Sequence, residues 1–167
     1  MPGIFRTWLI CASILSLSGC GLFERKPPPT EIEIKPAPQE ASIDFIATAS
    51  PLVNPSPSGT PSPIVLRLYQ LNGETAFADA NFRQLWEADE ETLGPTLLGK
   101  AELFLEPGGI QRIQANLIEG TVIVAVVAGF RQFENAKWRA MVPLQGEKRF
   151  KLKANLKTLE VVLGPQD

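Results

Sequence analysis

The sequence predicts a mainly β domain: a two-sheet sandwich of about eight strands with a short helical insert, preceded by a signal peptide and a proline-rich linker. Three observations lead to this prediction. Short segments alternate between apolar and polar residues, turn-forming residues separate them, and a single stretch has helical spacing. We place the signal peptide at residues 1–19, the linker at residues 20–40 and the sandwich domain at residues 41–167.

The first twenty residues have the three parts of a secretory signal. Arg6 gives the start a positive charge, an apolar run extends from Trp8 to Leu17, and the small residues Ser18 and Gly19 follow. The run of about ten residues is too short to cross a bilayer, which requires about twenty. The alternative interpretation is an apolar N-terminus that ends in a chance cysteine.

The segment Leu17-Ser18-Gly19-Cys20 resembles the lipobox of bacterial lipoprotein precursors. The resemblance implies cleavage between Gly19 and Cys20 and a covalent lipid on the sulfur of Cys20. The only other cysteine, Cys11, lies in the part to be removed, so lipidation explains a single cysteine in an oxidising compartment. Gly21 follows, not the aspartate that resembles an inner-membrane retention signal. We therefore expect a tri-acylated protein at the outer membrane.

The linker is rich in proline and charged residues between residues 24 and 40 and offers little that could enter a core. Such a composition favours an extended polyproline conformation, with a rise of about 3.1 Å per residue. Roughly seventeen residues then keep the domain up to about 50 Å from the lipid.

The first two strands are expected at Ser42–Ala49 and Ile64–Leu71. The first places Ile43, Phe45 and Ala47 on one face, and the second has a strong β composition. Residues 50–63 between them are dense in proline, serine, glycine and asparagine, which predicts a loop.

The remaining strands follow the same reasoning. Leu97–Leu105 and residues 110–117 flank a turn at residues 106–109, which predicts a hairpin. Residues 121–130 are almost wholly apolar, so both faces of this strand should be covered in a central position. Three more strands complete the sandwich, at residues 138–143, 149–154 and 158–163.

One stretch, residues 77–91, has helical spacing, and its recurring residues are Phe82, Leu85, Trp86 and Asp89. We expect one helix of one to two turns, or two short ones, over the sandwich, with Asp79 as the N-cap. Phe82 and Trp86 then fix the insert to the core; the alternative is a ligand-stacking role.

Composition excludes several kinds of chemistry. The chain has no histidine, which rules out Ser-His-Asp and Cys-His catalysis and the commonest zinc site. Its net charge of −2 gives no electrostatic reason to expect nucleic acid. We read the acids Glu87, Asp89, Glu90 and Glu91 as a solvated helix end, since glycoside chemistry needs two carboxylates facing across a cleft. We expect no catalytic residue, no metal and no cofactor other than the lipid on Cys20.

An ordered set of short motifs resembles the type VI secretion lipoprotein family, called TssJ, SciN or VasD. The matching residues are Asn54-Pro55, Gly59, Pro61 to Pro63, Ile64 to Leu71, Phe77 to Trp86, Leu93-Gly94, Leu97-Leu98, Glu106 to Gly108, Val127 to Arg131 and Lys137 to Arg139. The long proline-rich spacer and the Phe82-Arg83 pair depart from the family's pattern.

The resemblance implies a transthyretin-like sandwich with a helical insert, in an outer-membrane lipoprotein that faces the periplasm. It implies binding to the periplasmic region of the inner-membrane protein TssM, within a membrane complex that includes TssL. The loop between the first two strands is implicated in holding TssM. Here it comprises Asn54, Pro55, Ser56, Pro57, Ser58, Gly59 and Thr60. Arg131, Trp138 and Arg139 are interpreted as scaffold, through cation–π or hydrogen-bonded pairs between neighbouring strands.

Physical chemistry is compatible with binding by this loop. Its prolines lower the entropy lost when a partner docks. Its hydroxyl groups offer hydrogen bonds, and Leu52 and Val53 offer apolar contact. The alternative is a loop that only caps the end of the sandwich. Two other functions stay open: a periplasmic ligand-binding or enzymatic lipoprotein on an immunoglobulin-like scaffold, and a helper of outer-membrane protein folding that uses exposed sheet edges.

Overall fold

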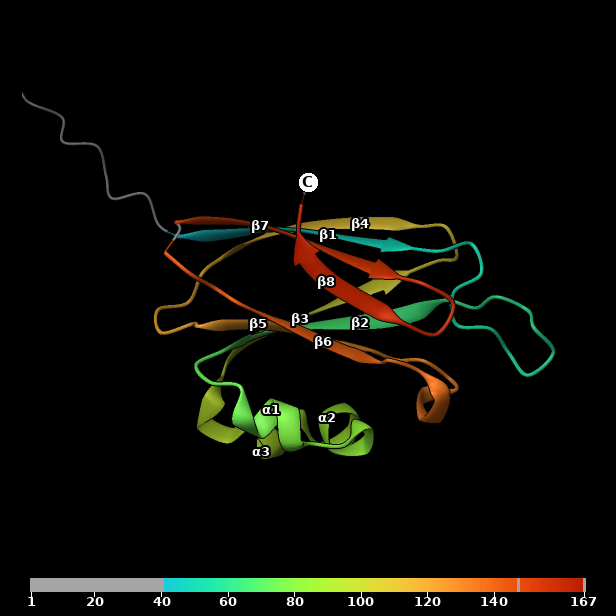
Figure 1. Cartoon of the computed structure of the whole chain (residues 1–167), viewed down its shortest axis with the longest axis horizontal. Coiled ribbons are helices and arrows are strands. Elements are labelled where there is room, and N and C mark those ends of the chain that lie inside the picture. The colour runs from blue at the N-terminus through green and yellow to red at the C-terminus, as the bar shows by residue number, and fades with distance from the viewer. Residues whose placement is uncertain (1–40, 147, 167) are drawn as a thin grey trace, which may run out of the picture. The chain divides into compact units, whose positions relative to one another are not determined.

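The computed structural model describes residues 41–146 and 148–166, which form two facing four-stranded sheets (Figure 1). One sheet has the order β4-β1-β7-β8 and the other β3-β2-β5-β6. The strands are β1 (Ser42–Ala49), β2 (Ile64–Leu71), β3 (Leu97–Leu105), β4 (Ile110–Asn116), β5 (Ile123–Ala128), β6 (Arg139–Pro143), β7 (Arg149–Leu156) and β8 (Val161–Pro165). The predicted sandwich is confirmed. The signal peptide, Cys20 and the linker lie outside the described residues.

In the first sheet β1 lies between β4 and β7, antiparallel to the former and parallel to the latter. Phe45 pairs with Ile113 on one side and with Leu152 on the other. Alternate residues of β1 and β7 are buried, so a register slip of one residue would turn the apolar side chains to solvent.

The second sheet is covered on both sides, which explains the apolar composition of β5. Val124, Val126 and Ala128 belong to the core between the sheets, whereas Ala125 and Val127 pack beneath the helices. All six residues of β5 are buried. The prediction of a central strand is confirmed, although the strand is shorter than residues 121–130.

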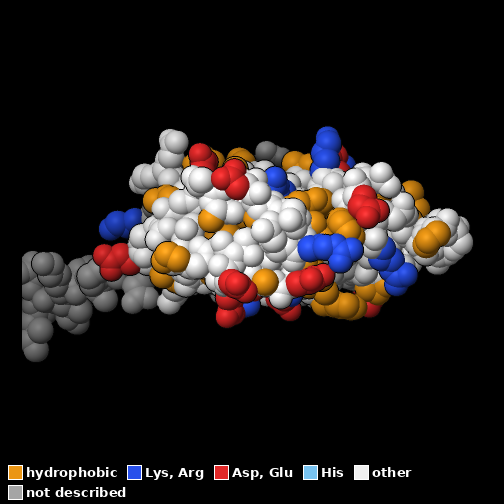
Figure 2. Space-filling view, turned by 90° about the horizontal axis from the view of Figure 1, so that it is seen from below, with side chains coloured by type: hydrophobic (Ala, Val, Ile, Leu, Met, Phe, Trp, Pro, Cys, Tyr) orange, Lys and Arg blue, Asp and Glu red, His pale blue; other side chains and the backbone are white. Residues whose placement is uncertain are grey.

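The helical insert consists of α1 (Thr75–Asp79), α2 (Phe82–Glu87), α3 (Asp89–Leu93) and the 3-10 turn η1 (Gly94–Thr96). It lies on the outer face of the second sheet, where acidic and basic side chains occur together (Figure 2). Phe77, Leu85 and Leu93 are buried on Tyr69 and Leu71. Among the described residues, no helix combines the length and apolar character needed to cross a membrane.

The predicted N-cap at Asp79 is wrong, because Asp79 is the last residue of α1. Ala80 is extended and ends this helix. Asn81 caps α2 instead: its side chain accepts a hydrogen bond from the Gln84 backbone N–H at 3.0 Å, and its own N–H donates to the Gln84 side chain at 2.9 Å. This capping box is visible in the sequence as Asn and Gln three residues apart.

Arg139 and an aromatic cluster attach the insert to the sandwich. The Arg139 guanidinium donates to the backbone carbonyls of Phe77, at 2.9 Å, and Ala80, at 2.6 Å. Phe82 stacks on Phe133 of the 3-10 turn η2 (Phe133–Asn135), with ring centroids 4.4 Å apart, and meets Trp138 edge-on at 5.2 Å. Phe82 therefore fixes the insert, as predicted.

The scaffold role expected of Arg139 takes a different form. Its guanidinium lies 4.8 Å from the ring centroid of Trp138, its neighbour in the chain, and not over a residue of a neighbouring strand. Arg131 is exposed, and its backbone N–H makes the contact described below.

Candidate partner-binding site

Four connections between strands gather at one end of the sandwich, which we call the loop end (Figure 1). They are residues 50–63, 106–109, 129–138 and 157–160. Backbone hydrogen bonds join the first two: Ala49 donates to Gly109 at 2.9 Å, and Gly108 donates to Ser50 at 3.2 Å. The loop of residues 50–63 extends beyond the sheets, whereas the described chain enters β1 at the opposite end (Figure 1).

Asn54 holds the base of this loop. Its side chain is 2% exposed, donates to the Pro63 carbonyl at 2.8 Å and accepts from the Arg131 backbone N–H at 2.8 Å. Its own backbone N–H donates to Thr158 at 3.0 Å. Asn54 also has a φ of 50°, a conformation that asparagine tolerates better than most residues. The residue thus joins three connections of the loop end, and it presents little surface to a partner.

The exposed tip of the loop is held by bonds within itself. The Ser56 backbone N–H donates to the Thr60 carbonyl at 2.8 Å, and Gly59 closes the turn with a φ of 84° and an N–H bond to Ser56. The hydroxyls of Ser56 and Ser58 lie 2.8 Å apart. Pro57, Ser58, Gly59 and Thr60 are exposed. Such a preorganised tip loses little conformational entropy on binding.

Exposed apolar side chains occur at the loop end. Leu52 of the loop is 61% exposed, Ile110 at the start of β4 is 58% exposed, and Phe104 near the end of β3 is 56% exposed. Ile110 pairs with Thr48 on the outer face of one sheet and Phe104 pairs with Val65 on the outer face of the other, so of these three only Leu52 belongs to the loop itself. An exposed apolar side chain beside polar groups is typical of protein–protein contact sites.

Of the two apolar contacts predicted for this loop, Leu52 is exposed, but Val53 is 0% exposed and packs in the core between the sheets, so the prediction for Val53 is wrong. Sequence reasoning also missed Phe104, which follows Lys100 and Glu102 on the outward side of β3.

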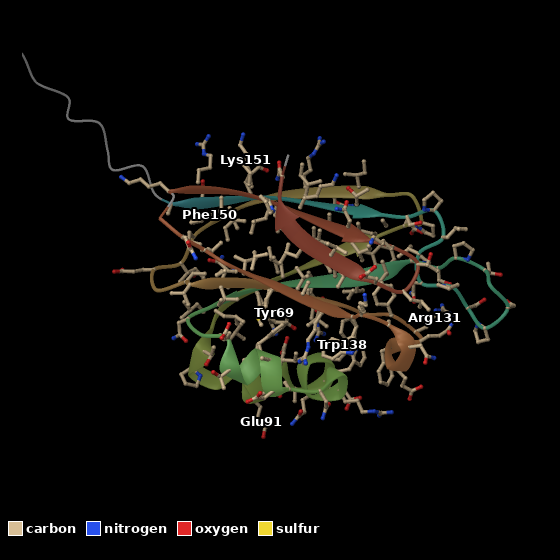
Figure 3. All side chains as sticks on the ribbon, viewed as in Figure 1. Tyr69, Glu91, Arg131, Trp138, Phe150 and Lys151 are labelled. Carbon is tan, nitrogen blue, oxygen red and sulfur yellow. The ribbon has the colours of Figure 1, made fainter. Side chains whose placement is uncertain are left out.

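A second polar site lies between the sheet and the helices, and it corrects one prediction. Asp89 was expected at a solvated helix end, but it is 7% exposed. It accepts from the Tyr69 hydroxyl at 3.1 Å and pairs with Lys100 at 3.3 Å and Arg67 at 3.6 Å. Its placement on the inner side of α3 explains the burial. Glu91 points into solvent and Tyr69 lies under the helices (Figure 3).

The charges of this site are matched internally. Burial alone would raise the pKa of Asp89, but the hydrogen bond from Tyr69 and the cations of Lys100 and Arg67 lower it below its ordinary value. Burial and the Asp89 carboxylate raise the pKa of Tyr69, which keeps its proton at neutral pH. We interpret the network as a support for the insert.

Comparison with known structures identifies proteins of the same fold. TssJ1, a type VI secretion lipoprotein of Pseudomonas aeruginosa, is 30% identical with a TM-score of 0.72, covering 77% of this chain and 98% of its own. Lip of Serratia marcescens, a membrane-bound component of the type VI secretion system, is 20% identical with a TM-score of 0.70, covering 77% and 99%.

A chain in the structure of the TssM C-terminal domain from EAEC is 21% identical with a TM-score of 0.62, covering 75% of this chain and 99% of its own. No curated protein sequence matches the chain. A model of the type VI secretion lipoprotein family (VasD, EvfM, TssJ) matches residues 41–160. The resemblance seen in the sequence is thereby confirmed: the chain belongs to the type VI secretion lipoprotein family.

Proposed function

We propose that this protein is an outer-membrane lipoprotein that anchors the type VI secretion membrane complex by binding the periplasmic region of the inner-membrane protein TssM. Its mechanism is binding plus anchorage, with no chemical step. The observation that carries this proposal is the loop end, where a preorganised tip belongs to the same loop as the exposed Leu52. The structure of the TssM C-terminal domain from EAEC contains a chain with a fold like that of this protein, which supports the choice of partner.

The anchor of the proposed tether is the lipid on Cys20, exposed by cleavage after Gly19. The chain then enters β1 at the end of the sandwich opposite the loop end, so membrane attachment leaves the proposed contact surface free (Figure 1). The complex would also include TssL.

Affinity capture of the lipidated protein from cell envelopes tests the partner. We expect TssM to be recovered with the wild-type protein, together with TssL, and to be recovered poorly when residues 56–60 are deleted. Recovery of neither protein under conditions that keep envelope complexes intact would contradict the proposal.

Membrane fractionation of Cys20→Ser tests the anchor. We expect this variant to fold, because Cys20 lies outside the sandwich, but to leave the outer-membrane fraction and to abolish secretion. Thermal unfolding of the purified variant is the control for folding. Normal anchoring of Cys20→Ser would refute the lipid attachment.

A further inference from the structure

The outer face of the sheet β4-β1-β7-β8 has no helix over it within the described part of the chain (Figure 1). Strand β7 of this sheet alternates cleanly: Phe150 points into the sandwich and Lys151 points away from it (Figure 3). The outward positions of this sheet are therefore a broad exposed surface, whereas the outer face of the other sheet is used to bury the insert.

Four cations converge on this surface, which we call the basic face: Arg112 of β4 and Arg149, Lys151 and Lys153 of β7. Lys153 and Arg112 lie opposite the same residue of β1, Ile46. Strands lie about 4.8 Å apart and alternate residues about 7 Å apart, so the four backbone positions fall within roughly 17 Å of one another.

No ion pair between described residues engages these four cations. Asp44 is the single acid among the outward positions of these four strands. The chain as a whole has more acidic than basic residues, 18 against 16, so the basic face runs against its overall balance.

Protection of a sheet edge does not account for the lysines. Lysine on an edge strand discourages pairing with other chains, but β7 lies between β1 and β8. The outer face of the other sheet differs in kind, because its cations have partners within the protein: Arg67 pairs with Glu102 at 2.7 Å, Lys100 pairs with Glu90 at 2.8 Å, and Arg139 donates to backbone carbonyls of the insert.

A hollow of about 520 Å³ lies on the same surface, beside the start of β1. Its polar lining consists of Ser42, Asp44, Gln114, Asn116, Arg149 and Lys151. The start of β1 lies beside two of the cations, because Ser42 pairs with Arg149 and Asp44 pairs with Lys151.

We propose that the basic face docks on the anionic phospholipid headgroups of the membrane that holds the chain's lipid. The inference rests on the proposed lipidation of Cys20, because a tethered domain meets its own membrane at high effective concentration. Charge complementarity selects the occupant, since basic clusters beside a membrane anchor bind anionic lipid. Each cation near such a surface favours the bound state about fivefold.

Lysine labelling tests the docking on the lipidated protein, purified from membranes and reconstituted in vesicles. Vesicles of phosphatidylethanolamine with phosphatidylglycerol are compared with vesicles of phosphatidylcholine alone. We expect Lys151 and Lys153 to lose reactivity on the anionic vesicles alone, and to regain it at about 1 M salt, where screening acts within about 3 Å. Lys137, which is 79% exposed elsewhere, is the internal control.

A matched pair of variants keeps the reporter lysines in place. Arg112→Glu with Arg149→Glu should abolish the protection of Lys151 and Lys153, since loss of two cations alone lowers docking about 25-fold. Arg83→Glu with Arg131→Glu makes the same charge change on exposed residues outside the basic face and should leave the protection intact.

The outcomes separate the basic face from the anchor. If the protein stays in the vesicles and its lysines react equally on both lipids, docking through the basic face is refuted while the lipid anchor stands. If the protein leaves both kinds of vesicle, the lipid anchor and docking through the basic face are both refuted. Protection that is equal in the two variants also contradicts the proposal.

Discussion

Replacement of Asn54 by alanine should destabilise the protein and disorganise the loop end. The side chain is 2% exposed and bridges the Pro63 carbonyl and the Arg131 backbone N–H, both at 2.8 Å. Alanine leaves these two groups without their partner. It also places an unfavourable residue at a φ of 50°.

The magnitude follows from these two losses. A hydrogen bond within a protein contributes about 1 kcal/mol net, and the left-handed conformation costs alanine about 1 kcal/mol more than glycine or asparagine. We expect Asn54→Ala to lower the free energy of unfolding by about 3 kcal/mol. For a domain of this size the midpoint of thermal unfolding should fall by roughly 10 °C.

Glycine at the same position separates the two causes. Asn54→Gly loses the same side-chain bonds without the backbone strain, so it should cost about 2 kcal/mol. Urea unfolding of both variants, with an unchanged dependence on urea, measures the two free energies. If both variants unfold within about 0.5 kcal/mol of wild type, Asn54 does not hold the loop end as described.

Two further substitutions test the insert. A Cβ on Gly129 would lie 2.5 Å from the Trp86 ring, so Gly129→Ala should lower the free energy of unfolding, measured in urea, by about 1–3 kcal/mol. Gly164 has open space around it, so the control Gly164→Ala should be neutral. Equal effects of the two substitutions would contradict the packing of Trp86 on Gly129. Asp89→Asn should cost about 2 kcal/mol at neutral pH. The pKa of Asp89 is lowered in the folded state, so the ionised carboxylate stabilises the fold above a pH of about 4, and this stabilisation is lost as the pH falls through the lowered pKa. The free energy of unfolding of Asp89→Asn should therefore depend less on acid pH than that of wild type. An unaltered pH dependence would argue against the network.

The strands could be predicted from the sequence because burial leaves a period of two. Ser42–Ala49 and Ile64–Leu71 have the predicted bounds, and the apolar run around β5 indicated a strand covered on both faces. The sequence contains no comparable pattern that shows which strands pair with each other. For example, β1 lies parallel to β7, where residues more than 100 positions apart in the chain meet. Alternation records which side of a strand is buried, and not its neighbour.

The sites were predicted less completely. The loop of residues 50–63 was recognised by composition, but the inward position of Asn54 depends on contacts with two other connections. Asp89 was assigned to solvent because it stands among other acids, whereas its partner Tyr69 lies on another element. The basic face was visible as alternation in β7, but Arg112 joins it only through the pairing of β4 with β1.

The central claim is that the loop end binds TssM, and calorimetric titration with the periplasmic region of TssM measures it directly. Leu52→Asp alters the exposed apolar side chain beside the loop tip, and Val122→Asp, which is 46% exposed before β5 in wild type, makes the same change at the opposite end. We expect Leu52→Asp to weaken binding at least tenfold, as for a central interface residue, and Val122→Asp to bind like wild type. Wild-type affinity in Leu52→Asp, or a comparable loss in Val122→Asp, would contradict binding through the loop end.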